Sequence, residues 1–198
     1  FYCDERVLIP RSYIAELLKD ELAPWVSDAE NVTRVLDLCT GSGCLGILAA
    51  EVFPNAKVDC VDISQDALDV AKINVERYGI QDRIELIKSD LFNELAGRQY
   101  DVIISNPPYI TDEAMANLTQ EYRHEPALAL GAGADGLDIV RRMMSDAKNY
   151  LTPRGVMVVE VGDGRAACEA AYPKTPFTWL ATENEDEMVF LLRREELA

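Results

Sequence analysis

Short apolar runs alternate with longer amphipathic segments over most of the chain. Each run is about six residues long, which is typical of a buried strand. The expected strands lie at 34–39, 57–62, 83–88, 100–105 and 156–161. Strands that alternate with helices predict a parallel sheet with helices on both faces.

Amphipathic segments with helical spacing lie between these runs. One covers 44–53, and the next begins after Ser64, a suitable N-cap, and stops at Gly79. A third covers 137–151. Near the start of the chain, Ser12 is a candidate N-cap for a further helix. The apolar stripe of that helix comprises Ile14, Leu17, Leu18 and Leu22.

The remaining segments are irregular. Residues 1–11 are expected to form a short hairpin or extended entry with a turn at 4–6. Residues 177–180 and 187–192 suit an antiparallel pair joined at Glu185 and Asp186. The stretch 110–136 lacks clean periodicity, and loops of this length inside compact domains are usually functional.

The composition suits one compact domain, since 48% of the 198 residues are hydrophobic. No apolar run approaches the roughly 20 residues that span a membrane. Five cysteines without Cys-x-x-Cys spacing argue for reduced thiols in a cytoplasmic protein and against a zinc site or disulfides. The chain begins with Phe1 rather than Met, so we expect that it is a fragment.

A net charge of −16 narrows the choice of partner. Most of these carboxylates are expected to keep the surface soluble. The same field repels a phosphate backbone and attracts a basic partner. The pairs at 141–142 and 193–194 are too small to form a basic patch, so tight nucleic-acid binding is not expected.

Glycines follow the first expected strand. Residues 41–46 (GSGCLG) match G-x-G-x-x-G, a weak signal that nicotinamide-binding proteins share. Asp62 lies 19 residues past Gly43, at the end of the next strand, where a carboxylate can accept hydrogen bonds from a ribose diol. A helix-capping role for Asp62 is also credible.

Three further features favour S-adenosylmethionine over NAD. Asp37 places an acid just before the glycine loop, close to where a cationic cofactor would lie. Asp90 ends the third strand, where it can hold an adenine amino group. The fourth strand leads to Asn106 without any apparatus for hydride transfer. In this interpretation the cofactor carboxylate faces the glycine loop and the ribose faces Asp62.

The turn formed by Asn106, Pro107, Pro108 and Tyr109 follows the fourth strand directly. Proline rings fix φ, restrict the preceding residue and remove N–H donors. The turn therefore offers carbonyl acceptors and the Asn106 side-chain oxygen to an –NH2 group, while Tyr109 supplies a flat face. That arrangement suits methylation of an amide or an exocyclic amine. An ordinary strand-to-loop turn is the alternative.

Together these motifs resemble the protein-glutamine methyltransferases of the HemK, PrmC and PrmB type. The segments that carry the resemblance are 37–43 (DLCTGSG), 61–64 (VDIS), 89–92 (SDLF) and 105–109 (SNPPY). Cys39 stands where the family often has Gly. The flanking runs 5–12 (ERVLIPRS), 121–126 (EYRHEP) and 176–180 (PFTWL) are closest to the PrmB branch, which methylates a glutamine of large-subunit ribosomal protein L-three.

The resemblance implies a class I S-adenosylmethionine-dependent methyltransferase, Rossmann-like, with a mostly parallel seven-stranded sheet and an antiparallel C-terminal strand pair. It implies that residues 1–24 form the hinge side of an N-terminal helical domain that is absent here, and that 25–198 form the catalytic domain. It assigns the cofactor site to Asp37, Thr40, Gly41, Ser42, Gly43, Asp62, Ile63, Asp90, Leu91 and Asn106.

By the same resemblance, the Asn106 side-chain oxygen and the Pro107 carbonyl accept the two hydrogens of a glutamine amide, and Tyr109 packs on the amide plane. Pro108 belongs to the same catalytic turn. Candidate substrate contacts are Arg11, Glu121, Arg123 and His124. For His124 a loop-ordering hydrogen bond is the favoured alternative.

Three other functions stay open at this point. They are methylation of a release factor, methylation of an adenine or guanine amine in nucleic acid, and a cofactor-binding module without catalysis. The flanking motifs oppose the first and the net charge opposes the second. The intact turn at Asn106 opposes the third.

Overall fold

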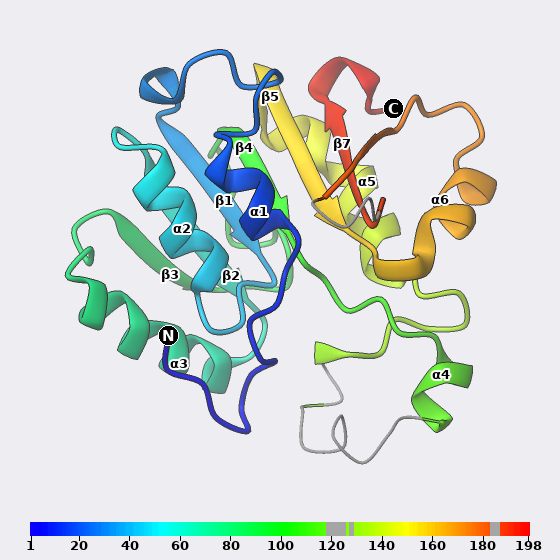
Figure 1. Ribbon diagram of the computed structural model, residues 1–198, viewed down its shortest axis with the longest axis horizontal. Helices are drawn as coiled ribbons and strands as arrows, with labels where there is room; N and C mark the ends of the chain where they lie inside the picture. The colour runs from blue at the N-terminus through cyan, green and yellow to red at the C-terminus, as the bar shows by residue number, and fades with distance from the viewer. Residues whose placement is uncertain (118–125, 127–128, 183–186) are drawn as a thin grey trace.

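The computed structural model describes residues 1–117, 126, 129–182 and 187–198. Within them a seven-stranded sheet runs through the centre of the molecule in the order β3-β2-β1-β4-β5-β7-β6 (Figure 1). The strands are β1 (Arg34–Leu38), β2 (Lys57–Asp62), β3 (Ile84–Lys88), β4 (Tyr100–Ser105), β5 (Leu151–Glu160), β6 (Thr178–Leu180) and β7 (Val189–Arg193). The strands from β3 to β5 are parallel, and β7 is antiparallel to β5 and β6. The predicted sheet is confirmed.

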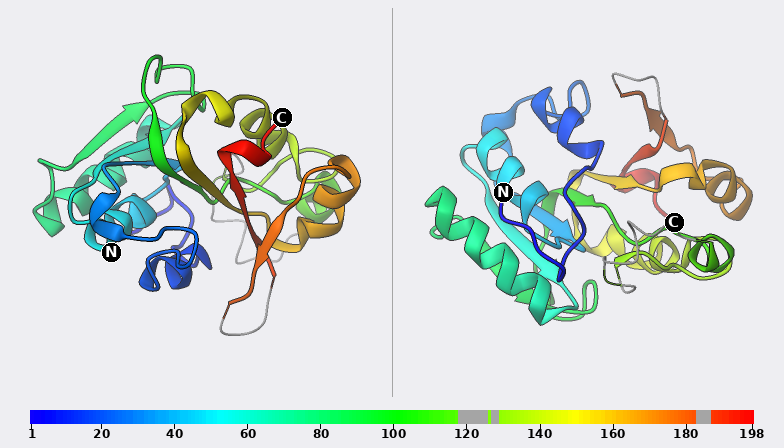
Figure 2. Two further views of the ribbon diagram at one scale, coloured as in Figure 1. Left: turned by 90° about the horizontal axis from the view of Figure 1, so that it is seen from above. Right: turned by 60° about the horizontal axis from the view of Figure 1, so that its bottom comes forward.

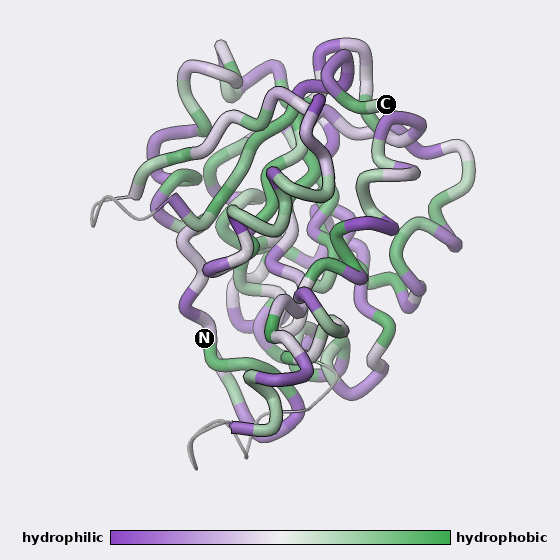
Figure 3. Tube along the Cα trace, turned by 90° about the vertical axis from the view of Figure 1, so that its right-hand side faces the viewer, coloured by the Kyte–Doolittle hydropathy of each residue, from purple (hydrophilic) through white to green (hydrophobic). Residues whose placement is uncertain are grey.

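Helices cover both faces of this sheet (Figure 2). One face carries α1 (Ile14–Lys19), α2 (Cys44–Val52) and α3 (Gln65–Tyr78), and the other carries α5 (Asp138–Tyr150) and α6 (Arg165–Ala171). Because successive strand residues point to opposite faces, Val35 packs in the first apolar cluster and Leu36 in the second. Hydrophobic stretches of the chain, green in Figure 3, accordingly run mostly through the interior of the molecule. Burial on both faces explains why the strands read as continuous apolar runs.

Most element boundaries agree with the sequence. The bounds of β2 and β4 are as predicted, and both ends of α3 are confirmed: the Ser64 side chain accepts a hydrogen bond from the Ala67 N–H at 3.3 Å, and Gly79 is left-handed with φ +67°. The β6–β7 pair is also confirmed. Its predicted junction at Glu185 and Asp186 lies outside the described residues.

Three expectations were wrong in detail. α1 ends at Lys19, and Leu22 reaches the core from the following turn. Ser12 is not the N-cap, because its hydroxyl donates to Glu160 and Tyr13 occupies that position. β5 begins at Leu151, directly after α5, rather than at 156, and a register irregularity beside Tyr100 accommodates this early part.

The irregular stretch after β4 contains the short helix α4 (Asp112–Ala116), which no sequence pattern predicted. The Thr111 side chain accepts a hydrogen bond from the Ala114 N–H at its start, and none of the helix residues is buried. Because α4 has no apolar face to bury, it lacks the periodic signal by which a helix is recognised.

The N-terminal segment packs against the rest of the chain. Ile14, Leu18 and Leu22 belong to the same apolar cluster as Val35 and Val58. The predicted division at residue 24, between a hinge segment and a catalytic domain, stays a prediction. No helix among the described residues is long and apolar enough to cross a lipid bilayer.

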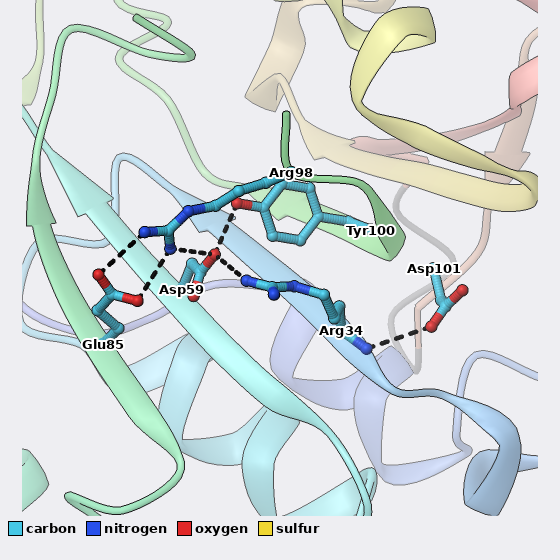
Figure 4. Close-up of polar contacts among 6 residues, drawn as sticks. All are labelled: Arg34, Asp59, Glu85, Arg98, Tyr100 and Asp101. Atoms are coloured by element: carbon cyan, nitrogen blue, oxygen red, sulfur yellow. Dashed lines mark hydrogen bonds and ion pairs between the residues drawn. The ribbon is translucent and has the colours of Figure 1, made fainter. Parts of the chain in front are cut away.

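A charged cluster ties together the amino-terminal ends of four strands, β1 to β4 (Figure 4). Asp59 in β2 is 2% exposed and accepts hydrogen bonds from Arg34 and Arg98, each at 2.8 Å, and from the Tyr100 hydroxyl at 2.7 Å. Glu85 completes the cluster by pairing with Arg98. A buried carboxylate is tolerable only with such partners. This cluster fixes the end of the sheet that lies opposite the carboxyl ends of the strands.

The contact between α2 and β2 provides a test of this packing. A Cβ added to Gly46 would overlap the Cys60 Sγ and lie 3.2 Å from an Asp37 oxygen. We expect Gly46→Ala to lower the free energy of unfolding by about 1–3 kcal/mol, as overpacking does. Cys60→Ala makes room, so the double variant should lose less than the sum of the two single variants, as measured by urea denaturation.

Gly164→Ala is the control, since its added Cβ would lie at an ordinary 3.4 Å from the Val161 Cβ. We expect the free energy of unfolding of this variant to lie within about 0.5 kcal/mol of the wild-type value. The described packing would be contradicted if the double variant lost as much unfolding free energy as the Gly46→Ala and Cys60→Ala variants lose together.

Candidate active site

A cavity of about 500 Å³ lies at the carboxyl ends of the central strands. Its walls come from the loop after β1, the ends of β2 and β3, the turn after β4, and the N-terminal segment. Ten of the predicted site residues line it: Arg11, Thr40, Gly41, Ser42, Asp62, Ile63, Asp90, Leu91, Asn106 and Pro108. Ligands of parallel α/β sheets bind at this edge. The structure therefore brings most of the predicted residues to one site.

The loop after β1 needs its glycines. Gly41 and Gly43 both have positive φ, at +55° and +80°, and a Cβ on Gly43 would lie only 3.1 Å from the Ala71 Cβ. Cys39, where the family often has Gly, is also left-handed with φ +58°. A side chain at a left-handed position is strained, and glycine is the residue that adopts this conformation at no steric cost. The loop is thus a tight turn, and its residues Thr40, Gly41 and Ser42 line the cavity.

Asp62 holds this loop in place. One of its carboxylate oxygens accepts the Gly41 N–H at 2.9 Å, and the other accepts the Ser64 N–H at 2.9 Å. Burial raises the pKa of Asp62, and these backbone hydrogen bonds oppose the rise by stabilising the charged form. Asp62 therefore supports the glycine loop and also presents a carboxylate to the cavity, so the capping and ligand-binding interpretations are compatible.

Asp37 does not line the cavity. It is fully buried, and one carboxylate oxygen accepts hydrogen bonds from the Thr40 hydroxyl at 2.5 Å and the Gly46 N–H at 2.9 Å. Among the described residues the other oxygen has no hydrogen-bond partner. In the structure Asp37 joins the loop to α2, and its expected place close to a cationic cofactor stays a prediction.

Asp90 lines the cavity and pairs with a residue that the sequence did not single out. The Arg142 guanidinium, on α5, donates a hydrogen bond to Asp90 at 2.8 Å, and Arg142 itself lines the cavity. From the sequence, Arg141 and Arg142 were considered only as a basic pair too small to bind nucleic acid. Nothing in the local pattern distinguishes Arg142, because the pairing depends on how α5 packs against the segment that follows β3.

The turn after β4 presents some of its residues to the cavity and turns others away. Asn106 and Pro108 line the cavity, whereas Pro107 and Tyr109 do not. The Tyr109 ring packs so closely on Gly162 that a Cβ added to Gly162 would lie 2.7 Å from a ring carbon. Burial raises the pKa of Glu160, and the Tyr109 side chain is among the groups that oppose this rise. The predicted role of Tyr109 against a substrate amide stays a prediction that this placement does not favour.

The other predicted residues are less informative. Gly43 lies behind the loop against Ala71 rather than in the cavity wall. Glu121, Arg123 and His124 lie outside the described residues. The cavity wall also includes residues from 1–12 that the sequence treated only as an entry segment, among them Phe1, Val7 and Ile9.

The cysteines near the cavity are not activated nucleophiles. Burial raises the pKa of the Cys39 thiol well above its usual range and that of Cys44 to about 11. Thiolates are the reactive form, so these thiols are inert at neutral pH. Among the described residues no group of three or more His, Cys, Asp or Glu side chains could hold a metal ion.

Comparison with known proteins agrees with this fold. The family model described as "Methyltransferase small domain" matches residues 22–133. The chain belongs to this family. Its predicted resemblance to the glutamine methyltransferase branch that acts on ribosomal protein L-three, also called uL3, is confirmed by the curated relatives.

These relatives are named ribosomal protein uL3 glutamine methyltransferase. The protein of Neisseria gonorrhoeae is 56% identical over 197 residues, covering 100% of this chain and 66% of its own length. That of Bordetella pertussis is 54% identical over 197 residues with the same coverage. The Francisella tularensis protein is 49% identical and is covered over 63% of its length. The chain thus spans somewhat less than two thirds of the length of these relatives.

Solved structures share the fold at low sequence identity. The hMettl16 catalytic domain in complex with MAT2A 3′UTR hairpin 6 has a TM-score of 0.69 at 19% identity, covering 97% of this chain and 73% of that one. TrmN from Thermus thermophilus has a TM-score of 0.63 at 20% identity, and the match covers 92% of this chain and 50% of TrmN. The predicted Rossmann-like methyltransferase fold is confirmed.

The buried acid behind the glycine loop predicts a pH dependence. Burial raises the pKa of Asp37 from its ordinary 3.8 to about 7. Between these values the folded protein keeps a proton that the unfolded chain releases, so the contribution of Asp37 to stability falls as pH rises from about 4 to 7. Asp37→Asn removes this dependence. The difference in unfolding free energy between wild type and variant should change by up to about 4 kcal/mol across that window.

Urea denaturation at several pH values measures this difference. Asp82→Asn removes one exposed carboxylate and is the control. A constant difference between wild type and Asp37→Asn from pH 4 to 7.5 would show that Asp37 is ionised throughout, contrary to the described burial.

Proposed function

We propose that the chain transfers a methyl group from S-adenosylmethionine to the side-chain amide nitrogen of a glutamine in ribosomal protein uL3. The names of the curated relatives support this activity. The proposal rests on one structural observation: the same cavity is lined by Gly41 and Asp62 and also by Asn106 and Pro108. The residues proposed to hold the cofactor and Asn106, one of the two proposed acceptors for a planar amide, therefore face a common space.

The described residues fit this cofactor. The glycine loop and the amino-terminal end of α2 suit a carboxylate, because backbone N–H groups and the helix dipole attract negative charge. Asp62 is oriented by two backbone hydrogen bonds and can still accept from a ribose diol. Asp90 is assigned to the adenine amino group. When bound, S-adenosylmethionine supplies a methyl group that its positively charged sulfur makes electrophilic.

Positioning accounts for the catalysis that the protein provides. An amide nitrogen is a weak nucleophile because its lone pair is delocalised into the carbonyl group. In the proposal, the Asn106 side-chain oxygen and the Pro107 carbonyl accept its two hydrogens and fix its orientation. Such alignment is worth roughly 7–11 kcal/mol of the barrier when the reacting atoms are well placed. With the cofactor bound, the nitrogen would take the methyl group as the bond between that methyl and the cofactor sulfur breaks, which would leave S-adenosylhomocysteine, and the nitrogen would then lose one proton to solvent.

The charge of the chain supports a basic protein as the substrate. A net charge of −16 attracts a free ribosomal protein and opposes tight binding to nucleic acid. We therefore propose that methylation precedes or accompanies ribosome assembly. The likeness to an RNA-bound structure, at 19% identity, extends to the fold alone.

Incubation with labelled S-adenosylmethionine and separate candidate substrates tests the proposal. Free uL3, a release factor and ribosomal RNA are the three candidates, followed by mass mapping of the modified residue. Label on a glutamine of uL3 is the expected result. Label on a release-factor glutamine would move the chain to the other branch, and label on RNA would refute protein methylation.

Asn106 variants test the acceptor role. We expect Asn106→Ala to lower kcat by about 10²–10³-fold, as loss of one preorganised hydrogen bond does in other enzymes. The Kd for S-adenosylhomocysteine, measured by calorimetry, should change only a few-fold. Asn106→Asp keeps an acceptor oxygen and should retain more activity than Asn106→Ala.

Asn149→Ala removes an exposed asparagine from α5 and is the matched control. Equal losses in kcat and cofactor affinity for Asn106→Ala would show that Asn106 binds the cofactor rather than the amide.

A further inference from the structure

Residues 1–12, here called the strap, run from beside α3 to the start of α1 and pass the carboxyl ends of the central strands (Figure 1). Most of the strap lines the cavity: Phe1, Arg6, Val7, Leu8, Ile9, Pro10, Arg11 and Ser12. The strap has no regular secondary structure of its own. Its position must therefore come from side-chain contacts with the folded domain.

Asn74 on α3 holds the first end of the strap. This side chain is fully buried, accepts a hydrogen bond from the Tyr2 N–H at 2.6 Å and donates to the Tyr2 carbonyl oxygen at 2.9 Å. It also donates to the Ser42 carbonyl oxygen at 2.9 Å. One amide group thus connects the strap to the glycine loop.

A small apolar cluster supports the same end. Val7, 3% exposed, packs on Ala67 and Val70 of α3, with Tyr2 and Cys3 at its edge. This cluster is separate from the two large clusters on the sheet faces. This end of the strap is therefore held by a cluster of its own, outside the main core.

Glu160 at the end of β5 holds the other end. Its carboxylate is 2% exposed and accepts hydrogen bonds from the Ser12 hydroxyl at 2.6 Å and the Tyr13 N–H at 3.0 Å. Burial raises the pKa of Glu160, and the Tyr109 side chain is among the neighbouring groups that oppose this rise. A buried carboxylate is costly unless such donors surround it. Glu160 thus connects the strap to the turn after β4.

We infer that Asn74 and Glu160 are positioning residues that hold the strap over the cavity, each by joining one end of it to one half of the active site. A ligand that contacts the strap and the glycine loop is retained as long as Asn74 keeps them together. The Asn106–Tyr109 turn is aligned as long as Glu160 holds Tyr109. The inference rests on the proposed function, because the occupant of the cavity is taken to be the methyl-donor cofactor.

The Asn74 anchor is tested by the rate at which S-adenosylhomocysteine dissociates from the 198-residue chain. Asn74→Asp keeps the acceptor for the Tyr2 N–H but loses both donors and places a carboxylate against two carbonyl oxygens. We expect the dissociation rate to rise at least tenfold. Asn149→Asp, an identical change at an exposed position of α5, should leave the rate unchanged.

Val7→Asp is the second variant, because it loosens the strap through the apolar cluster and leaves Asn74 in place. It should raise the dissociation rate in the same way. Failure of the wild type to bind S-adenosylhomocysteine would refute the proposed function. Wild-type binding with unchanged rates in both variants would refute the strap inference alone.

The Glu160 anchor is tested by amide hydrogen exchange. Glu160→Gln keeps one acceptor oxygen but turns an –NH2 group toward the donors. We expect at least tenfold faster exchange at the Tyr13 N–H and in residues 109–111, with the glycine loop unchanged. Asn74→Asp should show the converse: faster exchange at Tyr2 and in residues 40–43, with residues 109–111 unchanged.

Glu51→Gln, on the exposed side of α2, is the control for the loss of one carboxylate. Faster exchange spread over the whole chain in the Glu160 and Asn74 variants would mean that both residues serve global stability only. Unchanged exchange in residues 109–111 of Glu160→Gln and in residues 40–43 of Asn74→Asp would also overturn the inference.

Discussion

The parallel hydrogen-bond ladder between β1 and β4 sets the geometry of the whole site. Leu38 is in register with Ser105, and the Ser105 hydroxyl donates to the Leu38 carbonyl oxygen at 2.7 Å. The glycine loop begins directly after Leu38, and Asn106 directly after Ser105. Two segments almost 70 residues apart therefore leave neighbouring points of one sheet edge. No loop has to bring them together.

Buried carboxylates keep this edge in shape. Asp37 and Asp62 both accept hydrogen bonds from the backbone around the glycine loop, and Glu160 does the same for the strap. The burial raises the pKa of all three. In the site these acids act as buried hydrogen-bond acceptors for N–H and O–H groups. Most of the chain's other carboxylates instead keep the surface soluble.

The sequence pattern predicted the features that depend on interactions between residues close together in the chain. Apolar runs marked the central strands, and Ser64 and Gly79 marked the ends of α3, because capping and burial leave a signal within a few residues. The glycine loop, Asp62 and Asn106 were predicted because motif spacing and strand ends are both visible in the sequence. The pairing of Arg142 with Asp90, the burial of Asp37 and the turning of Tyr109 toward Glu160 depend on tertiary packing. The sequence did not predict how the strap is held, because its anchors are distant along the chain. Asn74 lies 72 residues from Tyr2, and Glu160 lies 148 residues from Ser12.

The central claim is that the turn at Asn106 holds a carboxamide beside the methyl-donor site. A crystal structure of the chain with S-adenosylhomocysteine and a glutamine-bearing uL3 peptide measures this directly. The account predicts that the glutamine amide nitrogen lies within hydrogen-bond distance of the Asn106 side-chain oxygen and points toward the cofactor sulfur. A glutamine bound elsewhere, or a cofactor whose sulfur faces away from Asn106, would contradict it.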